Sequence, residues 1–124
     1  MKRIILILIL AGLASISCAT QKKTLYYWGD YSKTLYALKK TPNEENLTRH
    51  KKELQEIIAK SAEKKLKVPP GVYAEYGFIL AREGDAKEAE KYFKLEAQTY
   101  PEATPFMEKL VAGINDNNTN EEQP

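Results

Sequence analysis

The chain has 124 residues, of which 43% are hydrophobic and 29% are charged, as in an ordinary globular domain. Its formal net charge is +2, but Lys2 and Arg3 lie in a segment that we expect to be removed, which leaves 17 basic and 17 acidic side chains. This neutral total argues against the strongly basic surface of a nucleic-acid-binding protein, so we expect no nucleic acid partner.

The N-terminus has the pattern of a secretory signal peptide. A short positive region, Met1-Lys2-Arg3, precedes an apolar run of eleven residues from Ile4 to Ala14. Such a run is too short to cross a bilayer core of about 30 Å as a helix. We therefore expect residues 1–17 to be a cleaved signal peptide.

The only cysteine of the chain, Cys18, lies where cleavage is expected. The stretch Ala14-Ser15-Ile16-Ser17-Cys18 resembles a bacterial lipobox, in which the thiol takes a diacylglycerol, although Ser15 replaces the usual leucine. The alternative is a plain signal peptide with an incidental cysteine. Each buried methylene contributes about 0.8 kcal/mol, so the acyl chains would hold the protein on a membrane. By resemblance to lipoprotein sorting, Ala19 favours the periplasmic side of the outer membrane of a Gram-negative bacterium.

Residues 18–24 form the expected lipidated tether, and residues 25–113 the expected domain. Apolar side chains recur at helical spacing within residues 25–40, which predicts a first helix there. The aromatic cluster of this segment has two interpretations: a helical core, or a platform that stacks on a glycan. The candidate stacking residues are Tyr27, Trp28, Tyr31 and Tyr36.

A second helix is predicted from Thr41-Pro42 to about Leu66. Thr41 and Glu44 have the spacing of a capping box, and proline suits the first helical position. One face of the helix is apolar: Leu47, Leu54, Ile57, Ile58, Ala62 and Leu66. His50 has no second ligand at metal-binding spacing, so we expect it to lie on the surface.

The segment from Pro70 to Pro101 predicts two short amphipathic helices joined by the turn Gly84-Asp85. Asp85 can cap the second helix, and Glu88 completes a capping box. Small residues at Gly77 and Ala89 would let the two helices approach closely. Because a single helix pair cannot bury its apolar faces alone, we expect it to pack against the rest of the chain.

This segment resembles a tetratricopeptide (TPR) repeat over residues 70–103. The matching positions are Tyr73, Tyr76, Gly77, Leu80, Gly84-Asp85, Ala89, Phe93 and Pro101. The sequence departs from the repeat at Glu96, where alanine is usual and Ala97 is adjacent. The resemblance implies an all-α fold of about five helices, arranged as stacked helical hairpins in a short α-solenoid.

The last predicted helix runs from Phe106 to about Ala112 and ends at Gly113. Its apolar residues Phe106, Leu110 and Val111 would cap the exposed end of the repeat. Residues 114–124 are polar and low in complexity, so we expect a disordered tail.

The arrangement LYYWGDYSKTLY followed by PPGVYAEYGFILAREGD also resembles a family of small bacterial lipoproteins of unknown function. Genes of that family lie beside those for a CsgG-type outer-membrane lipoprotein. The resemblance implies a shared cell-envelope assembly and a CsgG-type lipoprotein as a candidate partner, with no established activity to transfer.

Charge is distributed unevenly along the chain. Residues 22–67 hold 12 basic and 6 acidic side chains, whereas residues 68–124 hold 5 basic and 11 acidic ones. Three interpretations stay open: attraction of the basic half to anionic head groups, self-association through the basic and acidic halves, or simply solvated helix surfaces.

No pattern indicates catalysis or a cofactor other than the acyl chains on Cys18: the chain has no histidine pair, phosphate loop or nucleophile elbow. We therefore expect no enzyme. One hypothesis is a protein-interaction adaptor in the cell envelope, and the other is a module that binds a glycan such as peptidoglycan. By resemblance to TPR repeats, the adaptor's groove would be lined by Ala74, Phe78, Ala81 and Arg82. Phe78 would be its anchor unless the first hairpin buries it.

Overall fold

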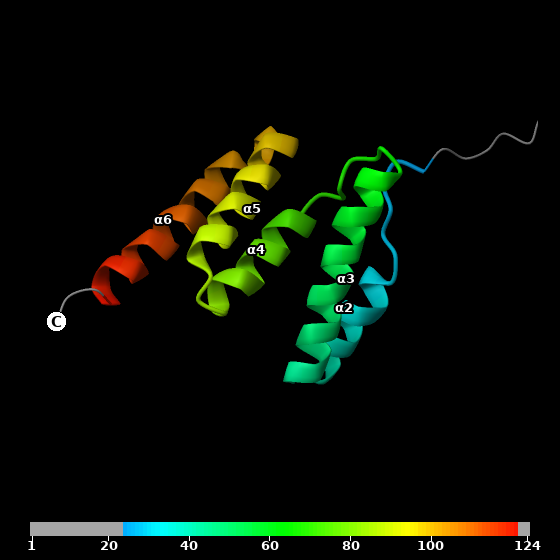
Figure 1. The fold of residues 1–124 in the computed structure, drawn as a ribbon, viewed down its shortest axis with the longest axis horizontal. Helices are drawn as coiled ribbons and strands as arrows, with labels where there is room; N and C mark the ends of the chain where they lie inside the picture. Colours follow the sequence, from blue (N-terminus) through cyan, green and yellow to red (C-terminus); the bar gives the residue numbers. More distant parts are fainter. Residues whose placement is uncertain (1–23, 122–124) are drawn as a thin grey trace, which may run out of the picture.

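The computed structural model describes residues 24–121 of the chain, with side chains described through residue 116. Within this part there are five α-helices and a short 3-10 helix, η1 (Pro101–Ala103), and no strand. The helices are α2 (Tyr31–Lys40), α3 (Glu44–Glu63), α4 (Val72–Arg82), α5 (Ala86–Thr99) and α6 (Thr104–Glu121), shown in Figure 1. The prediction of an all-α fold is confirmed. The expected signal peptide, Cys18 and most of the tether lie outside the described residues.

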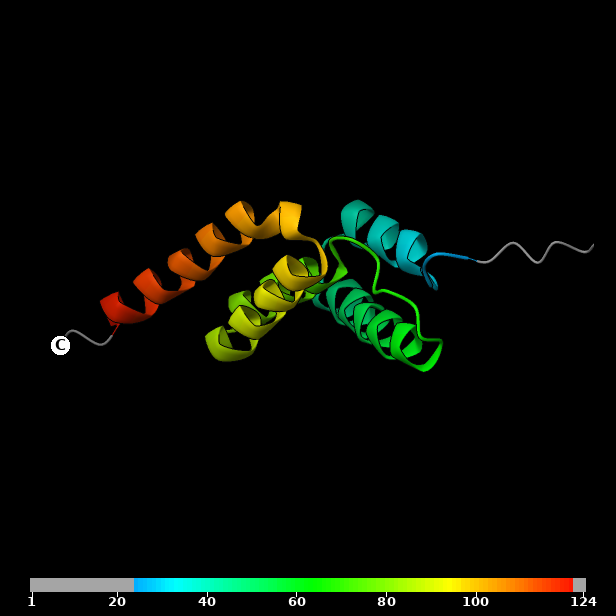
Figure 2. The same ribbon diagram turned by 90° about the horizontal axis from the view of Figure 1, so that it is seen from above.

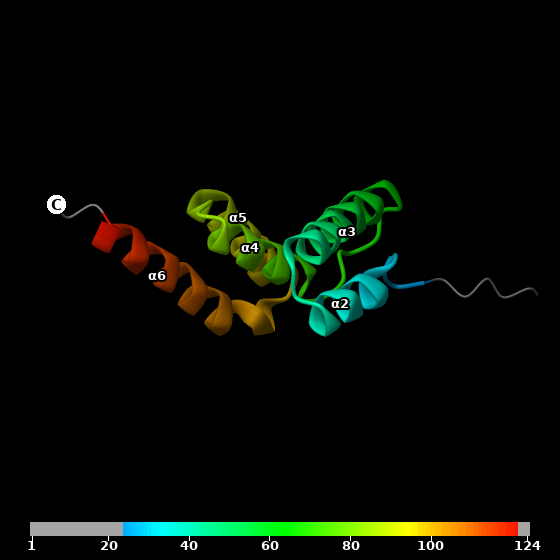
Figure 3. The same ribbon diagram turned by 90° about the horizontal axis from the view of Figure 1, so that it is seen from below.

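Helices that follow one another in the chain also pack against one another, from α2 with α3 to α5 with α6. Figure 1 shows the α2/α3 hairpin beside α4 and α5, with α6 beyond α5. Figures 2 and 3 show α2 and α6 toward one side of this row and α3 and α5 toward the other. The described helices therefore form an open row rather than a closed bundle.

The apolar core lies between α3, α4, α5 and the start of α6. Leu54, Ile57 and Ala89 are fully buried, and Phe93 is 1% exposed. Residues that pack on this core come from every described helix and extend from Tyr27 to Ile114. One continuous core therefore includes both hairpins and α6.

The α4–α5 hairpin forms as its sequence predicts. Gly84 takes a φ of 87°, which favours glycine, and the side chain of Asp85 accepts a hydrogen bond of 3.2 Å from the Glu88 backbone N–H. The Glu88 side chain pairs with Lys91 rather than completing the expected box. At Gly77 the helices are so close that an added Cβ would lie 3.0 Å from the Phe93 ring and 3.1 Å from the Ala89 carbonyl oxygen.

This close approach makes Gly77→Ala a destabilising substitution. We expect it to lower the free energy of unfolding by about 1–3 kcal/mol, because α4 and α5 must separate to admit a methyl group. Gly113→Ala is the matched control in α6, since an added Cβ there meets nothing within 4 Å. It should raise the free energy of unfolding by up to about 1 kcal/mol. Urea denaturation followed by circular dichroism measures both, and equal effects of the two variants would contradict the packing described here.

The first helix begins later than the sequence predicts, at Tyr31 instead of about residue 25. Gly29 has a φ of 46°, and the backbone N–H of Asp30 donates a 2.7 Å hydrogen bond to the Glu53 carboxylate of α3. An added Cβ on Gly29 would collide with the same carboxylate. A contact with a distant residue therefore holds this part of residues 25–30 out of helical geometry.

The second helix is shorter than predicted at both ends. Asn43, not Thr41, is its N-cap and accepts a 2.8 Å hydrogen bond from the Asn46 backbone N–H. The helix ends at Glu63 rather than near Leu66, because Lys65 takes a left-handed φ of 54°. Ala62, expected on the buried face, is exposed.

The last helix differs most from its prediction, since it continues through Gly113 to Glu121. Leu110, Val111 and Ile114 all pack on the core, and their spacing requires helical geometry beyond Gly113. The helix therefore includes residues 114–121 of the tail that we expected to be disordered. Phe106 is 60% exposed and does not cover the end of the hairpin, because Met107 takes the buried position.

Candidate functional site

A groove lies on the face of α4 between α2 and α6. Phe78, in the middle of α4, is 51% exposed and lines a cavity on each side. The first cavity, of about 550 Å³, lies against α2 and the start of α3. The second, of about 380 Å³, lies against α6. The aromatic side chain of Phe78 therefore forms the floor that the two cavities share.

The walls of the groove combine aliphatic side chains with charged ones of both signs. Leu35, Leu38 and Leu47 line the first cavity, and Leu110 and Ile114 line the second. The groove cations are Lys39 of α2, Arg82 of α4 and Lys109 of α6. None of these three forms an ion pair or hydrogen bond with another described residue. The groove thus offers an apolar floor with cations from three helices, and the carboxylates of Glu44 and Glu75 also line its first cavity.

The structure brings together three of the four residues predicted for the groove. Phe78 and Arg82 line both cavities, and Ala81 lines the second. Ala74 is different, because it is half-buried against the core and lines neither of them. The alternative that the first hairpin buries Phe78 is wrong.

A polar network forms part of the wall of the first cavity, which His50 and Glu75 line. His50 is fully buried, so the expectation that it lies on the surface is wrong. Its Nε2 lies 3.1 Å from Oε1 of Glu75, and its Nδ1 lies 2.8 Å from the Thr34 hydroxyl. Because a carboxylate only accepts, His50 donates to Glu75. The Tyr31 hydroxyl donates to the other Glu75 oxygen at 2.8 Å. One network therefore joins α2, α3 and α4.

The network also shifts the pKa of two of its members. Burial, with the hydrogen bond to Glu75, raises the pKa of Tyr31 to about 12, so its hydroxyl stays a donor at neutral pH. Burial alone would raise the pKa of Glu75, but hydrogen bonds from His50 and Tyr31 outweigh it and hold that pKa below its usual value. The ionised carboxylate is consequently the form that the fold favours.

This lowered pKa predicts a loss of stability in acid. Ionised Glu75 contributes to the free energy of unfolding above its unfolded-state pKa of about 4.3, and the contribution is lost as the pH falls through the lower folded-state value. We therefore expect that free energy to fall more steeply below about pH 5 in the wild type than in Glu75→Gln. Urea denaturation at a series of pH values checks this, and parallel profiles would show that Glu75 has no such role.

The four residues of the predicted aromatic cluster do not form one platform. Tyr27 packs on the core, and the Tyr31 hydroxyl donates its hydrogen bond to Glu75. Trp28 is 43% exposed and meets the Tyr31 ring edge-on at 5.3 Å between centroids. Tyr36 is 67% exposed and takes part in no ring contact among the described residues. Of these four aromatic residues, Trp28 and Tyr36 are therefore the two whose side chains are exposed.

The role of Glu96 was hardly indicated by the sequence. This residue is 3% exposed, and its carboxylate accepts a 2.7 Å hydrogen bond from the Gly71 backbone N–H at the start of α4. A carboxylate is favourable at a helix N-terminus. Its departure from the repeat pattern was the one available signal, and the structure explains that departure as a bond between α5 and α4.

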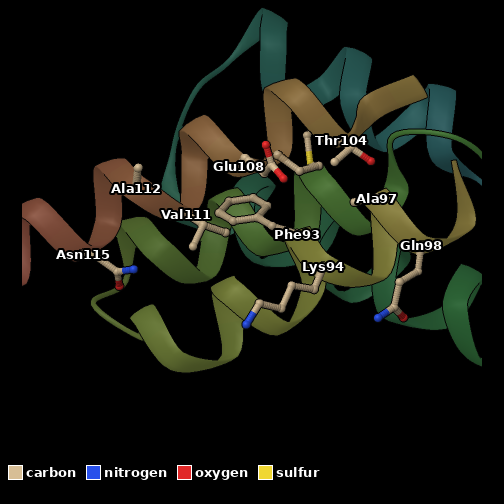
Figure 4. A pocket seen from close by; sticks show the side chains of 10 residues that line it. Phe93, Lys94, Ala97, Gln98, Thr104, Glu108, Val111, Ala112 and Asn115 are labelled. Atoms are coloured by element: carbon tan, nitrogen blue, oxygen red, sulfur yellow. The ribbon is translucent and has the colours of Figure 1, made fainter. Parts of the chain in front are cut away.

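A further cavity of about 600 Å³ lies between α5 and α6. Figure 4 shows Phe93 beside Val111 in this cavity, with Lys94 and Gln98 on the α5 side. Its walls include Met107, Val111 and Ala97, so it is an extension of the core surface. The described part of the chain holds no group of three residues suited to bind a metal ion. None of its helices has the length and hydrophobicity of a membrane span.

These features define an all-α protein of consecutive helical hairpins with an aromatic-floored groove along one side. The chain belongs to the DUF4810 family, a domain of unknown function, whose model matches residues 25–110. No curated protein and no solved structure matches it. The matched region begins at the start of the described body and ends within α6, so it includes all of α2 to α5.

Proposed function

We propose that the protein is an outer-membrane lipoprotein that acts in the periplasm as a protein-interaction adaptor of a cell-envelope or secretion-type assembly. The observation that carries this proposal is Phe78, which is 51% exposed between two cavities. Exposed aromatic side chains at the centre of a groove commonly supply most of the binding energy at a protein interface. The cations around Phe78 would orient the partner by its charge.

The proposal includes a TPR-like stack. Its supports are the spacing of Gly77, Ala89 and Phe93 and the packing of each helix on the next in the chain. In such a stack the first helix of each hairpin lines the binding face, which assigns α2, α4 and α6 to the groove. Residues of these three helices do line the two cavities beside Phe78.

The membrane anchor of the proposal is a diacylglycerol on Cys18. Its support is the lipobox-like stretch before Cys18, and Ala19 supports the outer membrane as the destination. After a high-salt wash, which weakens electrostatic contacts with lipid, Cys18→Ser should leave the membrane fraction while the wild type stays in it. An unchanged membrane fraction would remove the anchor from the proposal.

The partner is proposed to be an envelope protein, with a CsgG-type lipoprotein as the first candidate to test. We expect Phe78→Ala to abolish its capture, after cross-linking, from detergent-solubilised envelopes by the tagged protein. Phe106→Ala is the matched control, because Phe106 is a similarly exposed phenylalanine that lines neither cavity of the groove. Equal capture by both variants would contradict a partner site at Phe78.

The alternative function is binding of a glycan such as peptidoglycan, which the exposure of Trp28 favours. Purified sacculi would then sediment the wild type and Phe78→Ala but not Trp28→Ala. Self-association through the basic and acidic halves stays a prediction, and sedimentation velocity at low and high salt would test it.

A further inference from the structure

The end of the described structure that contains Leu25 combines exposed apolar side chains with lysines. Leu25 is 77% exposed and Trp28 is 43% exposed. Residues 60–67 contain four lysines and one glutamate, and Lys64, Lys65 and Lys67 are all exposed. We name Leu25, Trp28, Lys64, Lys65 and Lys67 the N-terminal patch.

Contacts between the two segments place them side by side. The Lys64 ammonium lies 5.7 Å from the centre of the Tyr27 ring, and the Lys67 ammonium lies 5.7 Å from that of Tyr100. Tyr26 in turn lies near Tyr100, because after burial it is the largest cause that raises the pKa of the Tyr100 hydroxyl. Figure 1 shows the segment before α2 running past the C-terminal end of α3. The apolar side chains and the lysines therefore belong to one end of the molecule.

The backbone conformation of Lys65 is a second indication that this end of the molecule has a function. Lys65 has a φ of 54°, and it is the only non-glycine residue with positive φ in the described chain. Its amide and that of Leu66 donate to the Ala62 and Ser61 carbonyls, which is the helix ending that glycine normally makes. Lysine bears a conformational cost here that glycine would avoid, and such costs are concentrated at functional positions.

The charges near the patch are favourable for an anionic surface. Glu63 is paired with Lys60, and Glu53 accepts from the Asp30 backbone N–H. Lys64, Lys65 and Lys67 form no ion pair with a described residue. Lys22 and Lys23 directly precede this end in the sequence. Lysines beside tryptophan and leucine are the chemistry that binds the interface of an anionic bilayer.

We propose that the N-terminal patch binds the surface of an anionic phospholipid bilayer, as a second membrane contact besides the lipid anchor. The position of the patch relative to the bilayer rests on the anchor of the proposed function. Leu25 is seven residue steps from Cys18, so an extended tether spans at most about 25 Å. Contact at this end directs α6 away from the bilayer, because α6 lies at the opposite end of the row from α2 and α3 (Figure 1).

The test uses a chain that begins at Ala19, which cannot be acylated at residue 18. All residues that form or pack on the core lie between Tyr27 and Ile114, so this chain retains the whole core. Trp28 is the only tryptophan, so its fluorescence reports directly on the patch. Vesicles of phosphatidylethanolamine with phosphatidylglycerol should bind the protein and shift its emission to shorter wavelength, and the binding should weaken as salt rises.

Three variants assign this binding to the patch. Joint replacement of Lys64, Lys65 and Lys67 by glutamine should lower vesicle binding by roughly a hundredfold, about fivefold for each lysine. The control replaces Lys87, Lys91 and Lys94 of α5 by glutamine, with the same charge change, and should keep most of the binding. Lys65→Gly should weaken binding about fivefold while leaving the fold as stable or more stable. That combination separates a surface role of Lys65 from a structural one.

Several results would overturn the proposal. These are no binding to anionic vesicles at low salt, equal binding to vesicles of neutral lipid, and equal losses in the two triple variants. Sedimentation with sacculi in the absence of vesicle binding would also overturn it, in favour of the glycan. Because the probe lacks Cys18, failure of acylation in cells leaves these outcomes unchanged, so the two proposals fail separately.

Discussion

Phe93→Ala is expected to lower the free energy of unfolding by about 3–5 kcal/mol, the largest effect among the substitutions proposed for this protein. Phe93 is 1% exposed, faces Gly77 where α4 and α5 are closest, and reaches the cavity between α5 and α6. Removing its ring leaves a void that the flanking helices cannot close without losing contacts. Thermal unfolding followed by circular dichroism should show a decrease in Tm of at least about 12 °C.

Phe93→Leu is the control for this substitution. Leucine fills much of the same volume, so we expect a smaller loss of about 1–2 kcal/mol. If Phe93→Ala lies within 1 kcal/mol of the wild type, Phe93 is not the central core residue.

His50→Ala is expected to lower the free energy of unfolding by about 2–4 kcal/mol. The substitution empties a fully buried site and removes hydrogen-bond partners of Thr34 and Glu75 together. Because the network joins α2 to α3 and α4, hydrogen exchange should also show faster opening of α2. Amides of α5 should keep their protection relative to the new global stability, since α5 makes no part of the network.

Thr34→Val distinguishes the contribution of the Thr34 hydroxyl to stability from that of its packing. Valine keeps the size of threonine but cannot bond to His50, so we expect a loss of about 1–2 kcal/mol. A His50→Ala protein that is as stable as the wild type, with α2 equally protected, would mean that the network does not hold the first hairpin in place.

The hairpin of α4 and α5 was predictable from the sequence, because its signals are local. Gly84 supplies the left-handed turn, and Asp85 caps the helix that follows it. The apolar positions of both helices follow the helical period. Helix boundaries set by such neighbours can be derived without knowledge of the rest of the fold.

Features that depend on distant residues could not be derived in this way. Part of the segment before α2 is held out of helix by Glu53, which is 23 residues from Asp30. His50 is buried because Thr34 and Glu75, on two other helices, satisfy its ring nitrogens. Spacing along one helix gives no information about such partners. The core contacts of Ile114, which extend α6 through Gly113, are also tertiary.

The candidate groove could be predicted only in part. The resemblance to TPR repeats predicts Phe78 and Arg82 as groove residues, because it assigns those positions of the first helix to the binding face. Lys39 and Lys109 were not singled out, since their position around Phe78 depends on how α2 and α6 are placed relative to α4. The sequence therefore indicated the floor of the groove, and the structure supplied its charged walls.

Photo-cross-linking in intact cells from position 78 tests the groove most directly. The photoreactive phenylalanine analogue p-benzoylphenylalanine would replace Phe78 in one strain and Phe106 in another, because the two side chains are similarly exposed and only Phe78 lies in the groove. We expect one envelope protein to be cross-linked from position 78 and not from position 106. The same cross-links from both positions, or none from position 78, would contradict a partner site in the groove.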